Sequence, residues 1–300
     1  MQKLTSRQLV NLVLLTLVWG LNWPVMKLGI TDFPPLTFRS ISLLAGLPLL
    51  ALVLVALKVP FRVPRRHWPE LLLLTVTNML VWHVCMILAL KNLSSGRAAI
   101  LGYTMPIFSA LIGALFFSGV LSRRGWMGVG AAALGVTLLL WHELTALAGR
   151  PVGVALALFA AAVWALGVQL VRRTKIEEPT LTLTFWMTAI STVGMTLLCV
   201  LFERQDWKWP GGTTWLTLLY NAVLIFCYAN AAWFYLARTL PPVASTLSVM
   251  MIPVLGVFSG AVWLREVLHW QDYAAVLLMM VAIGSVLWPT RTPPVAAPQR

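Results

Sequence analysis

Ten of the polar, aromatic and sulfur-containing side chains that lie deep inside long apolar stretches of this sequence are candidates for contact with a substrate. These residues are Trp19, Asn22, Asn78, Trp82, His83, Met86, Tyr103, Trp164, Tyr228 and Asn230. A polar group away from water needs a partner, and polar groups inside a membrane usually face the interior or a water-filled path. Aromatic faces with amide groups suit a flat amphipathic molecule, since paired rings gain about 0.5–1.5 kcal/mol beyond burial. We therefore predict that these residues bind a small substrate such as an aromatic amino acid.

The stretch from Asn78 to Met86 carries this pattern most densely. Asn78 and Trp82 are four residues apart and share a helix face with Met86, while His83 lies beside that face. Aromatic faces also attract flat cations, so hydrophobic cationic drugs stay open as an alternative substrate class. His83 titrates near neutral pH in water, which leaves proton-coupled antiport open. Because the sequence places no Asp or Glu near the middle of any apolar stretch, we favour facilitated export down a gradient.

An intramembrane enzyme is the rival class of function. No His-Glu-x-x-His motif occurs in the sequence, and His142-Glu143 stands at a helix end without a second histidine. Ser259 has no histidine at membrane depth in its own helix, although His83 is able to approach it from another. We predict no catalytic residue, no metal site and no cofactor, and keep an enzyme as a remote alternative. A channel is disfavoured because no ring of charge lines any stretch.

Nine further tryptophans and two basic residues are assigned to the membrane surface. Lys27 and Arg39 lie near the ends of apolar stretches, where snorkelling towards the headgroups is a more common fate than binding a carboxylate. Trp23, Trp186 and Trp233 lie inside their stretches and are, like Trp19, Trp82 and Trp164, candidates for the substrate site. The others are expected to form an interfacial belt: Trp68, Trp126, Trp141, Trp207, Trp209, Trp215, Trp263, Trp270 and Trp288.

The elements that position these residues are predicted to be membrane helices. The chain has 300 residues, of which 60% are hydrophobic and only 10% are charged. Soluble domains carry about a quarter charged residues, so this chain lacks the charge to cover a soluble surface. A span needs about 20 apolar residues. Ten stretches qualify, and we expect an all-α integral membrane protein: 8–30, 34–57, 68–90, 97–119, 125–141, 152–172, 180–202, 214–237, 242–264 and 270–288.

The net charge of +13 indicates orientation rather than a nucleic-acid partner. Most of the 22 basic residues fall in loops on one side of the predicted spans, among them Arg65, Arg66, Arg123 and Arg124. By the positive-inside rule, both termini are predicted to be cytoplasmic. The three cysteines lie in apolar stretches and are predicted to be small core residues: Cys85, Cys199 and Cys227.

The two halves of the sequence repeat each other. Residues 91–141 align without gaps on residues 238–288 at an offset of 147, which places Pro106 on Pro253. Five spans per half make the halves inverted, an arrangement that in transporters places the substrate between them. We predict repeat 1 over 1–145, repeat 2 over 146–289 and a disordered cytoplasmic tail over 290–300. Since proline weakens a helix, Pro106 and Pro253 are predicted hinges.

Three features resemble a known family: Trp-Gly-Leu-Asn-Trp-Pro at Trp19 to Pro24, Arg39 early in the second span, and the matched Pro106 and Pro253. The chain resembles the ten-helix drug/metabolite transporter superfamily with two EamA-type repeats, and within it bacterial aromatic amino acid exporters. The second repeat departs from the pattern, with Gly167 opposite Asn22 and Trp186 opposite Arg39. The resemblance implies an alternating-access exporter of aromatic and other neutral amino acids in a bacterial inner membrane, surrounded by lipid and functional as a monomer.

Overall fold

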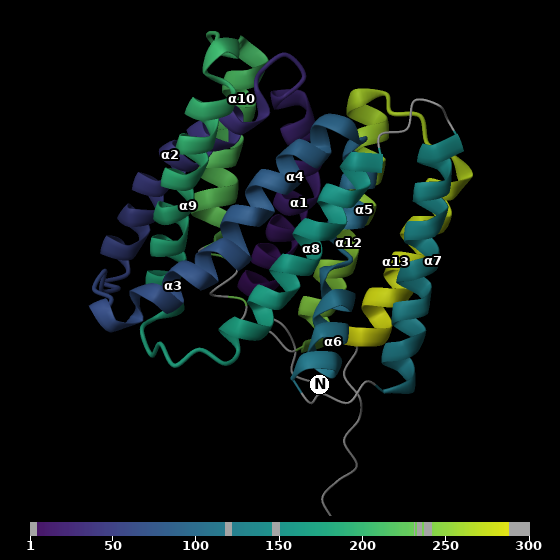
Figure 1. The fold of residues 1–300 in the computed structure, drawn as a ribbon, viewed down its shortest axis with the longest axis horizontal. Coiled ribbons are helices and arrows are strands. Elements are labelled where there is room, and N and C mark those ends of the chain that lie inside the picture. The colour runs from purple at the N-terminus through teal and green to yellow at the C-terminus, as the bar shows by residue number, and fades with distance from the viewer. Residues whose placement is uncertain are drawn as a thin grey trace, which may run out of the picture.

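The chain folds into a bundle of helices (Figure 1). The computed structural model describes residues 5–117, 122–145, 151–230, 232, 236 and 242–287, and these residues contain no strand. The predicted tail at 290–300 and Trp233 lie outside this part of the chain. The all-helical fold class is therefore the one that the sequence predicts.

The helices follow the apolar stretches of the sequence closely. In chain order they are α1 Ser6–Gly29, α2 Pro35–Ala56, η1 Arg65–His67, α3 Trp68–Thr75, η2 Val76–Leu80, α4 Val81–Asn92, α5 Ser95–Gly102, α6 Met105–Phe116, α7 Arg123–Thr145, α8 Pro151–Val171, α9 Thr180–Phe202, η3 Arg204–Asp206, α10 Gly212–Tyr220, η4 Asn221–Ala229, α12 Pro242–Leu264 and α13 Trp270–Leu287. Local signals fix several starts. Thr5 and Gln8 form a capping box before α1, and prolines stand in the first turns of α2, α3 and α6.

Seven helical stretches in the described part of the chain are long and apolar enough to cross a membrane. They are Ser6–Gly29, Pro35–Ala56, Arg65–Asn92, Ser95–Phe116, Pro151–Val171, Thr180–Phe202 and Gly212–Ala229. The other three predicted spans fall on α7, α12 and α13. The seven stretches identify a multi-pass membrane protein, and the count of ten stays a prediction.

The outer surface of the bundle is apolar, as a lipid-facing surface must be. Large side chains such as Leu52, Val55, Leu201 and Phe202 are more than 60% exposed. Seven tryptophans of the expected belt are also exposed: Trp126, Trp141, Trp207, Trp209, Trp215, Trp263 and Trp270. The candidate binding residues, by contrast, are buried or half-buried.

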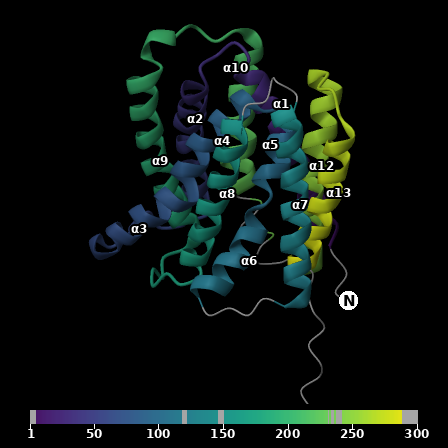
Figure 2. The same cartoon turned by 45° about the vertical axis from the view of Figure 1, so that its right-hand side comes forward.

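Helices from the two halves of the chain pack in matching pairs. Helix α1 packs on α12, and α8 packs on α5 and α6; α4 contacts α8, and α1 contacts α10 and η4. Helices α2 and α9 contact each other, as do α7 and α13, which stand side by side at one edge of the bundle (Figures 1 and 2). Two π-helical segments also match, because the offset of 147 carries residues 76–80 of η2 onto 223–227 of η4. Wide turns of this kind often occur at functional sites.

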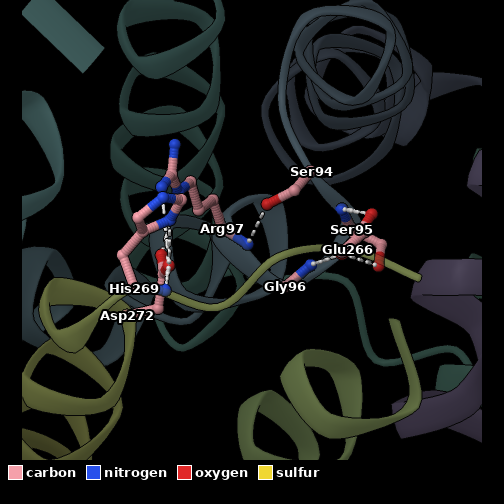
Figure 3. A network of polar contacts seen from close by, with 7 residues as sticks. All are labelled: Ser94, Ser95, Gly96, Arg97, Glu266, His269 and Asp272. Atoms are coloured by element: carbon pink, nitrogen blue, oxygen red, sulfur yellow. Dashed lines mark hydrogen bonds and ion pairs between the residues drawn. The ribbon is translucent and has the colours of Figure 1, made fainter. Parts of the chain in front are cut away.

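Carboxylates from the second half of the chain hold the first turns of two helices in the first half. Glu266 accepts hydrogen bonds from the Ser95 backbone N–H at 2.7 Å and the Ser95 hydroxyl at 2.9 Å, which fixes the start of α5 (Figure 3). Glu203 accepts from the backbone N–H groups of Leu36 at 3.0 Å and Thr37 at 2.7 Å, at the start of α2. A carboxylate at a helix N-terminus satisfies free N–H groups and complements the helix dipole.

An ion pair strengthens the junction at α5, within the first turn of that helix. Arg97 Nε lies 2.9 Å from Asp272 Oδ1, and Asp272 also accepts a hydrogen bond from the His269 backbone N–H at 2.9 Å (Figure 3). The loop between α12 and α13 is thereby tied to α5. These contacts set the position of the helix whose last residues, Gly102 and Tyr103, enter the candidate site.

Candidate functional site

An aromatic cluster lies where α1, α4, α5 and α8 meet. We use this name for Trp23, Trp82, Met86, Tyr103 and Trp164. The rings of Trp82 and Trp164 have their centroids 5.6 Å apart and are tilted by 38°, which joins α4 to α8. Trp23 and Tyr103 meet edge to face at 6.5 Å. These separations lie in the range of favourable aromatic pairs.

Gly102 is the position around which the aromatic cluster closes. A Cβ atom built on Gly102 would lie 2.5 Å from the Met86 Cε atom, 3.1 Å from Trp23 Cη2 and 3.3 Å from Trp82 Cη2. Only glycine leaves room for these side chains to converge there. Gly102 is not among the predicted site residues, and the one signal for it in the sequence is that it directly precedes Tyr103.

The fourth predicted span is broken beside the aromatic cluster. Helix α5 ends at Gly102 and α6 begins at Met105, with Pro106 in its first turn. Because Pro106 has no N–H, it cannot bond to the carbonyl of Gly102 four residues earlier. Helix α12, which the predicted repeat pairs with this span, instead runs unbroken through Pro253. The two predicted hinge positions therefore differ in shape within one structure.

A polar group lies on the α2 side of α1. We use this name for Arg39, His83, Asn221 and Phe226, together with Asn22, which lies one helical turn before Met26 on α1. Arg39 is only 4% exposed. Its Nη1 donates to Asn221 Oδ1 at 3.4 Å, its Nη2 donates to the Met26 sulfur, and its Cζ lies 5.9 Å from the centre of the Phe226 ring. The snorkelling expected for Arg39 is therefore wrong, because α1, α2 and η4 enclose the side chain.

Lys27, the other basic residue expected to snorkel, has a structural use. Its ammonium donates to the backbone carbonyls of Leu90 at 2.7 Å and Leu93 at 2.8 Å. These carbonyls lie at the end of α4, where a helix leaves acceptors free. Lys27 thus ties α1 to the end of the helix that carries Trp82 and His83.

His83 and Asn22 bring buried polar atoms without partners to the polar group. The His83 ring meets Phe226 edge to face at 5.7 Å, and both of its nitrogens are buried without a hydrogen-bond partner. The Asn22 side-chain oxygen is also buried without a partner. Most buried polar groups are satisfied, so each such atom calls for an explanation. Asn221 and Phe226 were not among the predicted site residues.

The remaining predicted residues lie around these two groups or apart from them. The Asn78 amide donates to its own helix at Leu74 O, 2.9 Å away, and packs against Gly167. Asn230 donates to Phe226 O at 2.9 Å. The Tyr228 hydroxyl donates to Asn11 at 3.4 Å, towards the start of α1. Trp19 packs between the apolar clusters around Trp23 and around Leu15.

Of the ten predicted residues, the structure thus brings Trp82, Met86, Tyr103 and Trp164 into the aromatic cluster and Asn22 and His83 into the polar group. Trp186, one of the interior tryptophans, instead donates from Nε1 to Phe61 O at 2.6 Å and packs on Trp68. That placement joins α9 to a loop between helices. In the described ranges, no group of three or more His, Cys, Asp or Glu side chains is arranged to hold a metal ion.

Comparison with known proteins gives a consistent result along the whole length of the chain. The profile of the EamA-like transporter family matches residues 7–141 and again residues 151–288. A crystal structure superposes with a TM-score of 0.64 over 94% of this chain and 97% of its own length, at 19% identity. At that identity the likeness concerns the fold alone.

Several bacterial proteins are similar over nearly their full lengths. The probable amino-acid metabolite efflux pump of Salmonella typhimurium is 29% identical, over 90% of this chain and 91% of that protein. The inner membrane transporter YedA of Escherichia coli is 28% identical, over 95% and 92%. The transporter YoaV of Bacillus subtilis is 24% identical, over 90% and 91%.

Proposed function

This chain belongs to the EamA-like transporter family, and on that premise we propose that it exports aromatic and other neutral amino acids across a bacterial inner membrane. Export proceeds by alternating access, down the gradient of the substrate. A single chain suffices, because an internal repeat supplies the two related halves that this mechanism needs.

The matched packing of the helices supports the inverted-repeat architecture behind this proposal. The family profile matches twice, over segments close to the proposed repeats 1–145 and 146–289. Exchanging the two halves turns the pair of α1 and α12 into the pair of α8 with α5 and α6. The same exchange turns the π segment η2 into η4. These pairs are compatible with the proposed topology of ten spans with both termini in the cytoplasm.

The pair Trp82 and Trp164 is the observation that carries the choice of substrate. It joins α4 of the first half to α8 of the second, at 5.6 Å between ring centroids, and both side chains are half-buried. A flat ring that contacts both indoles would bind to both halves at once. Binding at micromolar strength needs about 8 kcal/mol, which several ring contacts and hydrogen bonds supply together. Two similar proteins are named as amino-acid metabolite efflux pumps.

The alternative of cationic drugs is weakened by the buried Arg39. Its guanidinium is buried inside the helix bundle, and no carboxylate among the described residues pairs with it. An organic cation entering beside it would meet like charge in a medium of low dielectric constant. Proton-coupled antiport retains one supporting observation, the buried and unpartnered imidazole of His83.

Counterflow in liposomes that contain the purified protein tests the proposal. We expect internal unlabelled aromatic amino acid to drive uptake of labelled tryptophan or phenylalanine with equal pH on both sides. Other neutral amino acids should compete less strongly, and nucleosides and quaternary cations least. Liposomes without protein give the background rate.

Two results would contradict the proposal in different ways. Uptake driven only by quaternary cations would make the protein a drug exporter. Uphill accumulation on an imposed pH step, lost in His83→Ala but retained in His67→Ala, would make His83 a proton carrier and the facilitated mechanism wrong.

A further inference from the structure

We propose that Arg39, Asn22 and His83 form a site for the head group of an α-amino acid. Arg39 binds the carboxylate and Asn22 accepts a hydrogen bond from the ammonium group, while the ring of the substrate enters the aromatic cluster. This inference rests on the proposed transport function and adds to it the chemical groups that the substrate must carry.

The surroundings of Arg39 are those of a cation without its counter-ion. Its Nε is buried without a partner, its bond to Asn221 is long at 3.4 Å, and its other hydrogen-bond partner is the weak acceptor sulfur of Met26. A buried charge is costly unless it is paired and hydrogen-bonded. Guanidinium geometry matches a carboxylate with two parallel hydrogen bonds. A bound carboxylate would supply the charge that the described residues around Arg39 lack.

Lys27 shows how this protein treats a cation that has only a structural role. The Lys27 ammonium reaches two backbone carbonyls at 2.8 Å or less. Arg39, on the neighbouring helix and more deeply buried, makes no contact of that quality to an oxygen in the described part of the chain. The difference favours a ligand for Arg39 over a purely structural role.

Asn22 and His83 supply what the other end of a zwitterion needs. Asn22 lies one helical turn before Met26, the residue that touches Arg39, so both share a face of α1. Its unpartnered oxygen is an acceptor that suits an ammonium group. His83 faces the same Phe226 ring as Arg39, and its two unpartnered nitrogens offer further hydrogen bonds.

The sequence places the polar group next to the aromatic cluster on two helices. Asn22 is followed by Trp23 on α1, and His83 is preceded by Trp82 on α4. Neighbouring residues of a helix point in directions about 100° apart, so each helix presents one residue to each group. A small molecule with a charged head and an aromatic side chain that binds beside α1 and α4 would therefore contact both groups.

Competition binding to the purified full-length protein tests the inference. Labelled tryptophan is bound first, and unlabelled compounds then compete with it. The competitors are tryptophan, tryptophan amide, which lacks the carboxylate, indole-3-propionate, which lacks the ammonium group, leucine and leucinamide. For the wild-type protein we expect each amide to compete about tenfold or more weakly than its acid, since hydrogen bonds to charged groups are strong. Arg39→Gln should remove this preference, and Arg39→Lys should keep part of it. Asn22→Leu should instead remove the preference for tryptophan over indole-3-propionate.

The affinity for each acid is divided by the affinity for its amide within the same variant, so a lower yield of folded protein does not change this ratio. Lys175→Gln, at an exposed cation on the loop after α8, is the matched control and should behave as wild type. An unchanged preference in Arg39→Gln, or equal binding of acid and amide by the wild type, would overturn the inference. If labelled leucine binds with an Arg39-dependent preference over leucinamide while labelled tryptophan is neither bound nor transported, the head-group site is retained and the aromatic substrate is wrong.

Discussion

Replacing Trp164 by alanine is expected to weaken transport of aromatic amino acids by about 5-fold to 30-fold, as a rise in the apparent KM. The substrate ring would lose one aromatic partner and part of its apolar contact, together about 1–2 kcal/mol. The ring pair described for Trp164 is with Trp82. Removing the Trp164 ring therefore leaves the pair of Trp23 and Tyr103 in place. Initial rates of counterflow over a range of tryptophan concentrations give the KM.

Phe159→Ala is the matched control for Trp164→Ala. Phe159 lies on the same helix α8 but is 56% exposed on the outer surface. It should leave the KM for tryptophan unchanged at equal amounts of folded protein. Trp164→Phe, which keeps a ring, should recover most of the loss. A Trp164→Ala variant with wild-type kinetics would remove Trp164 from the site.

Replacing Gly102 by leucine is expected to reduce transport to the background rate. The new Cβ alone would lie 2.5 Å from Met86 Cε and 3.1 Å from Trp23 Cη2, so the side chains of the aromatic cluster must move apart. Overpacking of this kind costs about 1–3 kcal/mol of folding stability, which a folded protein commonly survives. The leucine would displace the side chains that we expect to contact the ring of the substrate. Counterflow of tryptophan and thermal unfolding of the same samples separate the two effects.

Gly130→Leu is the control for the change to leucine itself. Gly130 lies on the exposed side of α7, and a Cβ there would meet no atom within 4 Å. This variant should transport at the wild-type rate. Normal transport by Gly102→Leu would show that the junction at Gly102 is not on the path of the substrate.

The helices were predictable because the length of an apolar stretch is a local property. The stretch 180–202 coincides with α9 Thr180–Phe202, and 242–264 coincides with α12 Pro242–Leu264. The family identified from the Trp19 to Pro24 motif is confirmed by the family profile. The break at Tyr103 was not predictable, since Pro106 and Pro253 are equivalent in sequence and only the packing around them decides which helix bends. The π segments also depend on packing.

The candidate site was predictable in its residue types more than in its contacts. Burial depth and aromatic character were enough to select Trp82, His83, Tyr103 and Trp164. The same reasoning placed Arg39 at the membrane surface, because the position of a basic residue near a helix end does not reveal that α1 and η4 close over it. It placed Trp186 among the interior candidates, although the indole bonds to Phe61 O at a loop. Both differences arise from contacts between helices far apart in the sequence.

Distances across the two prolines test the central claim, alternating access between inverted halves, most directly. Spin labels at Lys91 and Leu115 span the break between α5 and α6, and labels at Met251 and Val262 span Pro253; all four positions are exposed. The native cysteines at Cys85, Cys199 and Cys227 are first replaced by alanine, and the labelled protein is placed in liposomes with and without an aromatic amino acid. Since the halves exchange shapes when access switches, we predict a second population in which the first distance is longer and the second is shorter. Two single distances that substrate leaves unchanged, in labelled protein that still transports, would contradict the account.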